Sequence, residues 1–124
     1  MLTMARNIAR QRRVAEQIMR ELANILREDL NDPRVGMTTL TAVELSPDYS
    51  YAKVFFTRLS DPQEVSLTLA ALKHASGFLR SQLAHRLSMR SVPELRFVHD
   101  SSVERGMRLS QLIEQAVAGK SNDT

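Results

Sequence analysis

The sequence predicts an α+β domain whose helices cover one face of a three-stranded sheet, in the order α-β-β-α-α-β-α. Stretches with apolar residues at helical spacing and short stretches with strand-like alternation are separated by turn signals. With 124 residues, 43% hydrophobic and 25% charged, the chain has the size and composition of one globular domain. We expect residues 1–117 to form that domain and residues 118–124 to be a flexible tail.

The first predicted helix runs from about Ala5 to Leu30 and has one apolar and one basic side. Its apolar side consists of Val14, Ile18, Leu22 and Ile25. Its opposite side carries five arginines at spacings of three, four or seven residues, namely Arg6, Arg10, Arg13, Arg20 and Arg27. Like charges at such spacings weakly oppose helix formation, and a polyanion would relieve their repulsion. The alternative is an ordinary solvated helix face.

Two strands, Thr39–Leu45 and Tyr51–Arg58, are predicted to pair as an antiparallel hairpin. Between them Ser46-Pro47-Asp48-Tyr49 has the composition of a tight turn with Pro at its second position. The alternation places Thr41, Val43 and Leu45 on one face of the first strand, and Ala52, Val54 and Phe56 on one face of the second. Tyr49 and Tyr51 could stack on nucleic-acid bases, although tyrosines beside a hairpin turn are more often packing residues.

A long helical stretch follows, and Asp61, Pro62 and Glu64 mark its start as cap, first helical residue and capping-box partner. A straight helix from Val65 to Arg90 would span about 39 Å, more than the roughly 35 Å diameter of such a domain. We therefore predict two helices kinked at Ala75-Ser76-Gly77, although the uninterrupted apolar stripe also fits a straight helix. We further expect Gly77→Ala to destabilise the fold and weaken binding, as it must if Gly77 has a positive φ. In a straight helix the same change would instead stabilise the fold by up to about 1 kcal/mol.

The end of the chain contributes a third strand and a last helix. Glu94–His99 is the predicted strand, with Leu95 and Phe97 pointing inward. Ser101 and Glu104 have the spacing of a second capping box, and a helix is expected after them.

Charge is unevenly distributed along the chain, although its net value is only +3. Residues 1–27 and 65–93 each carry a net +4, whereas residues 28–64 carry −4 and residues 94–124 carry −1. Residues 65–93 contain no Asp or Glu, and their basic residues are Lys73, Arg80, Arg86 and Arg90. This asymmetry favours a polyanionic partner about as much as it favours an unevenly charged solvated surface. The apolar stripe is flanked by Arg80, Arg86 and Arg90. These arginines could either pack along the rim of the core or extend to bind phosphate, and we give the two roles equal weight.

Familiar catalytic and metal-binding patterns are missing. The chain has no Cys, and its four glycines build no GxGxxG, Walker or GxSxG motif. His74 and His85 are three helical turns apart, too far to share a metal ion on a straight helix. We therefore expect no enzyme, metal, cofactor or small-molecule substrate.

No apolar run approaches the ~20 residues of a membrane span, and the N-terminus lacks the apolar core of a signal peptide. A cytoplasmic protein without a membrane partner is expected.

Several segments, in their order and spacing, resemble the ribosome-binding factor A family. They are Arg13–Glu16, Asp32–Met37, Val43–Ser46, Tyr51–Val54, Ala75–Arg80, Val92–Phe97 and Glu104–Arg108. The similarity extends from about Arg10 to Ile113. The resemblance implies a type II KH-like domain. Ordinary KH domains hold single strands with a GXXG loop, which this chain lacks; the family has an Ala-x-Gly kink instead, here Ala75-Ser76-Gly77.

The resemblance also implies a function and a binding surface. Family members are late assembly factors that bind the small ribosomal subunit and its precursor rRNA, support 5′-end maturation and matter most in the cold. We accordingly expect a non-enzymatic factor, monomeric when free, that binds the 30S subunit and precursor 16S rRNA. Its expected RNA-binding residues are Arg6, Arg10, Arg13, Arg20, Arg27, Lys73, Ala75, Ser76, Gly77, Arg80, Arg86 and Arg90. The alternative is a protein–protein adaptor whose basic face meets an acidic partner.

Overall fold

The elements follow the predicted order. The computed structural model describes residues 2–30, 32–35, 38–58, 62–101 and 109–117. Its labelled elements are α1 (Leu2–Glu28), β1 (Thr39–Leu45), β2 (Tyr51–Thr57), α2 (Pro62–His74), α3 (Ser76–Leu87) and β3 (Glu94–His99). Residues 109–117 form a further helical segment. The α+β, KH-like class with a three-stranded sheet is confirmed.

The sheet has the strand order β1-β2-β3, with β2 in the centre. β1 and β2 are antiparallel, as predicted, and β3 lies parallel to β2. A parallel neighbour requires a crossover connection, and the α2–α3 pair supplies it. The predicted turn is confirmed by the Tyr49 backbone N–H, which donates to the Ser46 carbonyl at 2.9 Å. Tyr49 itself has a φ of 63°.

A β-bulge in β1 changes which of its side chains face the core. Leu40 pairs with Phe56 and Ala42 pairs with Phe55, so Thr41 is the extra residue. Leu40 and Leu45 are therefore both buried, although their odd separation would place them on opposite faces of a regular strand. The prediction that Thr41 lies on one face with Val43 and Leu45 is wrong for Thr41, because the register shifts between Leu40 and Ala42. Thr41 is half-buried, and its hydroxyl donates to Asp100 Oδ2 at 2.8 Å.

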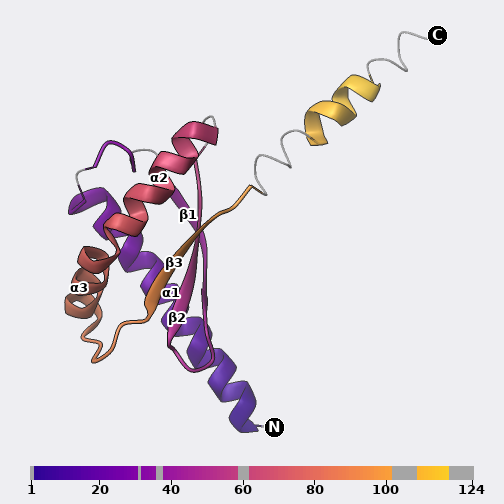
Figure 1. Cartoon of the computed structure of the whole chain (residues 1–124). Helices are drawn as coiled ribbons and strands as arrows, with labels where there is room; N and C mark the ends of the chain where they lie inside the picture. The colour runs from indigo at the N-terminus through magenta and orange to yellow at the C-terminus, as the bar shows by residue number, and fades with distance from the viewer. Residues whose placement is uncertain (1, 31, 36–37, 59–61, 102–108, 118–124) are drawn as a thin grey trace.

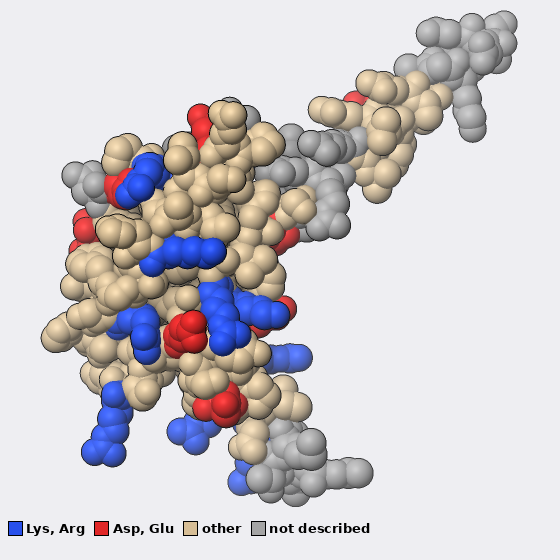
Figure 2. Space-filling view, in the orientation of Figure 1, with Lys and Arg blue, Asp and Glu red and all other residues tan. Residues whose placement is uncertain are grey.

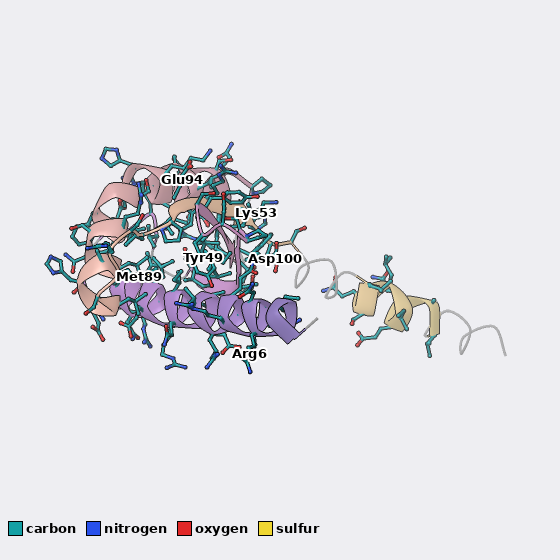
Figure 3. The ribbon with its side chains drawn as sticks, turned by 90° about the horizontal axis from the view of Figure 1, so that it is seen from below. Arg6, Tyr49, Lys53, Met89, Glu94 and Asp100 are labelled. Atoms are coloured by element: carbon teal, nitrogen blue, oxygen red, sulfur yellow. The ribbon has the colours of Figure 1, made fainter. Side chains whose placement is uncertain are left out.

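α1, α2 and α3 wrap around one face of the sheet and bury a shared core, whereas the helical segment 109–117 projects away from it (Figures 1 and 3). α1 packs against β1 and α3, while α2 and α3 both contact β3. Fully buried or nearly buried core side chains come from every labelled element: Ile18, Leu22, Ile25, Leu40, Leu45, Ala52, Val54, Phe56, Ala71, Leu72, Leu79, Leu83, Leu95 and Phe97. The predicted apolar sides of α1, β2 and β3 are thereby confirmed. Burial of this surface is the main term that stabilises the domain.

The kink between α2 and α3 is confirmed, but its expected cause is wrong. Ala75 separates the helices with φ −83° and ψ −2°, in the sparsely populated bridge region. Its N–H donates to Ala71 O at 3.0 Å, and its carbonyl accepts from Leu79 N at 2.9 Å. Gly77 lies in the first turn of α3 and has no positive φ. A Cβ at Gly77 would meet nothing within 4 Å, so the bend does not depend on this glycine.

Element ends differ from the predicted ones by a few residues. α1 begins at Leu2 and ends at Glu28, and β2 ends at Thr57. α2 begins at Pro62, as expected, whereas α3 ends at Leu87 because Ser88 takes a left-handed conformation with φ 50°. Asp61, Glu104 and the tail 118–124 lie outside the described residues, so both capping boxes and the tail remain predictions.

Candidate nucleic-acid interface

The arginines of α1 form one exposed row on the side of the helix that faces away from the sheet. Arg6, Arg10, Arg13, Arg20 and Arg27 are all exposed, and Figure 3 shows Arg6 pointing outward from α1. No carboxylate pairs with these five residues within the described part of the chain; Arg27 donates to the Asn24 side chain on the same helix. The helix buries its other side through Ile18, Leu22 and Ile25. The row is therefore available to a polyanion along the length of α1.

Arg86 of α3 is engaged by acidic residues at the C-terminal end of α1. Its guanidinium nitrogens lie 3.2 Å from Glu21, 3.4 Å from Glu28 and 2.9 Å from Asp29. The hydrogen bonds that Arg86 donates, first to Asp29 and then to Glu21, raise the pKa of Arg86 above its ordinary value. The Arg86 side chain is only 27% exposed. This geometry favours the core-rim role for Arg86 over contact with phosphate.

The other predicted residues on α2 and α3 are more accessible. Arg80 is exposed, and its Nη2 donates to the Val92 carbonyl at 2.9 Å, which fixes the segment between α3 and β3. Lys73 and Arg90 are exposed, and within the described residues neither forms an ion pair. At the kink, Ala75 and Ser76 are half-buried whereas Gly77 is exposed. The kink thus offers backbone and a small side chain, but little charge of its own.

The segment that follows α1 is fixed to α2 by a compact polar cluster. Arg34 binds Asp32 through Nη2 at 2.8 Å and through Nε at 3.1 Å. These hydrogen bonds, together with one from the Arg34 backbone N–H, lower the pKa of Asp32 below its ordinary value. The Arg34 carbonyl accepts hydrogen bonds from the buried Thr68 hydroxyl and from Arg58 Nη1. The cluster holds the C-terminal end of α1 beside the helix that leads into the kink.

The two basic segments of the sequence do not merge into one surface. Figure 3 shows α1 along one side of the molecule and α2 on the opposite side, with α3 between them. In Figure 2, Lys and Arg side chains are scattered over the visible face, with Asp and Glu among them. Part of the +4 charge of residues 65–93 is also balanced internally, because Arg86 pairs with acids of α1. The row on α1 has five exposed arginines, more than the exposed Lys73, Arg80 and Arg90 provide around the kink.

Comparison with known proteins assigns the chain to a family. Residues 10–113 match the family model described as Ribosome-binding factor A. The chain belongs to this family. It is 56% identical to the ribosome-binding factor A of Nitrosomonas europaea over 114 residues, which cover 92% of this chain and 97% of that protein.

Solved structures of ribosome-binding factor A share the fold. The crystal structure of the Thermus thermophilus protein matches with a TM-score of 0.65 at 32% identity, covering 72% of this chain and 93% of that one. A homology model of the Thermus thermophilus ribosome-binding factor A, fitted into the cryo-EM map of a 30S complex, matches with a TM-score of 0.59 at 33% identity, covering 70% of this chain and 91% of that one.

The outer face of the sheet carries charged and aromatic side chains that sequence reasoning did not group together. Arg96 lies over the ring of Tyr51, with 3.9 Å between its Cζ and the ring centroid. Lys53 is exposed on the same face and pairs in register with Arg96. Strand alternation puts Lys53 and Phe55 on one face of β2, but only the parallel register of β2 and β3 brings Arg96 beside them.

Sites of other kinds do not arise in the described ranges. No group of three or more His, Asp or Glu side chains there is arranged to hold a metal ion. Nor does any helix that the structure describes have the length and apolar character needed to cross a membrane.

Proposed function

We propose that this chain is an assembly factor that binds the small (30S) ribosomal subunit and its precursor 16S rRNA. In this proposal it supports late maturation and 5′-end processing without cleaving RNA itself. It acts in the cytoplasm as a monomer when free. Membership of the ribosome-binding factor A family supports the proposal most strongly. The relative fitted into a 30S complex, at 33% identity, supports the choice of subunit.

Within this proposal the exposed arginine row of α1 provides the main rRNA contact. Five guanidinium groups on one helix side, free of carboxylate partners among the described residues, suit a phosphate backbone. Lys73, Arg80 and Arg90 add contacts around the kink, where the backbone of Ala75, Ser76 and Gly77 is close to the surface. Arg86 acts indirectly, because its ion pairs hold α1 against α3.

The salt dependence of binding tests this surface. Affinity for precursor 16S rRNA should fall with salt at a slope of about −0.7 to −0.9 per phosphate contact. Replacing Arg10 and Arg13 together by Ala should flatten the slope by roughly two contacts. Lys53 and Arg96, both replaced by Ala, form the matched control, because the same charge is removed from the outer face of the sheet.

Each outcome separates two interpretations. A flatter slope for the α1 double variant alone supports the proposed contact. An equal change in both double variants would mean that net charge, rather than the α1 row, determines affinity. Binding of a nucleic-acid-free acidic protein in place of rRNA and small subunits would favour the adaptor instead.

A further inference from the structure

A groove lies between the N-terminal half of α1 and the loop that joins β1 to β2. It has a volume of about 510 Å³, within the roughly 300–1,000 Å³ typical of small-ligand sites. Its α1 wall consists of Asn7, Ile8, Arg10 and Gln11, and its loop wall consists of Pro47 and Tyr49. The groove therefore combines apolar surface and an aromatic ring with two carboxamides and one guanidinium group.

Tyr49 is held rigidly at this groove. Its φ of 63° is a strained value for a bulky residue, and such values persist only where the surroundings enforce them. Asp48 Oδ1 accepts hydrogen bonds from Ser46 Oγ at 2.9 Å, from Ser50 N at 3.0 Å and from Ser50 Oγ at 2.7 Å. These bonds fix the loop backbone on either side of Tyr49, and the half-buried Tyr49 side chain packs against the core. A ligand that stacks on the exposed part of the ring therefore has to order little of the protein.

The opposite wall is fixed as well. Gln11 Nε2 donates to the Leu45 carbonyl at the end of β1, which ties α1 to the strand and leaves Gln11 Oε1 as an acceptor. Asn7, one turn before Gln11, and Arg10, directly before it, are both exposed. These groups complement a ligand that has a flat ring, hydrogen-bonding groups along the edge of that ring and a negatively charged group attached to it.

We propose that this groove binds one unpaired nucleotide of the RNA. The base stacks on Tyr49 and contacts Ile8 and Pro47, the carboxamides of Asn7 and Gln11 bind its edge, and Arg10 binds its phosphate. Proteins recognise single-stranded RNA through such stacked, splayed bases. The chain lacks the GXXG loop with which KH domains hold single strands, and the groove is a separate place where one base can be held. The inference rests on the proposed rRNA-binding function and adds that one site on the protein binds a single unpaired nucleotide.

Tyrosine fluorescence tests the groove with two variants that both keep an aromatic ring at position 49. The chain has two Tyr and no Trp, so Tyr51→Phe leaves Tyr49 as the reporter and Tyr49→Phe leaves Tyr51. Both variants are titrated with single-stranded oligo(A) and oligo(U), and with a duplex RNA as the paired control. Single strands should quench Tyr51→Phe and not Tyr49→Phe, and the duplex should quench neither.

Affinity provides the second measurement. Tyr49→Leu should weaken single-strand binding by about five- to a hundredfold, since stacking on one aromatic side chain has about that effect. Tyr49→Phe, which keeps the ring, should bind single strands more tightly than Tyr49→Leu. If Tyr49→Leu fails to fold, the fluorescence of Tyr51→Phe still decides the question.

Two results would overturn the assignment. One is RNA binding by Tyr51→Phe with unchanged fluorescence, and the other is equal quenching of both single-tyrosine proteins. If the unmodified protein binds small subunits and rRNA but shows either result, the groove assignment fails and the proposed function stands. If it binds neither small subunits nor rRNA, the proposed function itself fails.

Discussion

Arg86 on α3 forms an ion pair with Asp29 just beyond the end of α1, with 2.9 Å between Nη2 and Oδ2. Glu21 and Glu28 bind the same guanidinium group. One arginine thus joins the arginine-bearing helix to the kinked helix pair. The pairing also neutralises acids that would otherwise weaken the attraction of α1 for a polyanion.

Replacing Arg86 by Ala should lower the denaturation midpoint, because three carboxylates near the α1–α3 contact lose their partner. The difference from the unmodified protein should shrink with added salt, since these groups are partly exposed. Arg90→Ala is the matched control, because Arg90 is exposed without an ion pair among the described residues. Equal urea midpoints for the two variants would contradict a structural role for Arg86.

Gly77→Ala should raise stability, by up to about 1 kcal/mol, since Ala has the higher helix propensity and restricts the unfolded chain. The space beside Gly77 is open and its φ is not positive, so the added methyl group meets no obstacle. This sign is the opposite of the one expected from the sequence. Urea denaturation of the two proteins measures it, and a lower midpoint for Gly77→Ala would show that the kink depends on glycine after all.

Asp48 should make stability depend on pH. Hydrogen bonds, first from the Ser50 side chain and then from the Ser50 backbone and Ser46, hold the pKa of Asp48 below its ordinary value. Because the folded pKa is the lower one, the stabilisation is fully present above the unfolded value of about 3.9 and is lost as pH falls through the folded pKa. The midpoint difference between the unmodified protein and Asp48→Asn should therefore be largest near neutrality and shrink well below about pH 4. A difference that stays constant across this range would mean that the carboxylate charge does not matter.

Phe56 and Phe55 are neighbours on β2 with different surroundings. Phe56 is completely buried, whereas Phe55 is half-buried on the other face. Phe56→Ala should cost about 3–5 kcal/mol of unfolding free energy through lost burial and the cavity left behind. Phe55→Ala should cost clearly less, and equal losses in chemical denaturation would contradict the assignment of strand faces.

The sequence by itself determined the element types and the core. Helical spacing identified α1 and its two sides, and strict alternation identified the inward faces of β2 and β3, because both signals repeat over neighbouring residues. The length of the central helical stretch predicted a kink at Ala75–Gly77. The segments that resemble ribosome-binding factor A were sufficient to indicate the family, and the family match confirmed it.

Only the tertiary structure decided which distant residues meet. The bulge at Thr41 follows from pairing with Phe55 and Phe56 and from the bond to Asp100, none of which is local to β1. Arg86 finds its carboxylates 57 to 65 residues away in sequence, and the groove at Tyr49 exists because α1 lies beside the β1–β2 loop. Periodicity reports which side of an element is apolar, whereas these contacts depend on how elements far apart in the chain are oriented against one another.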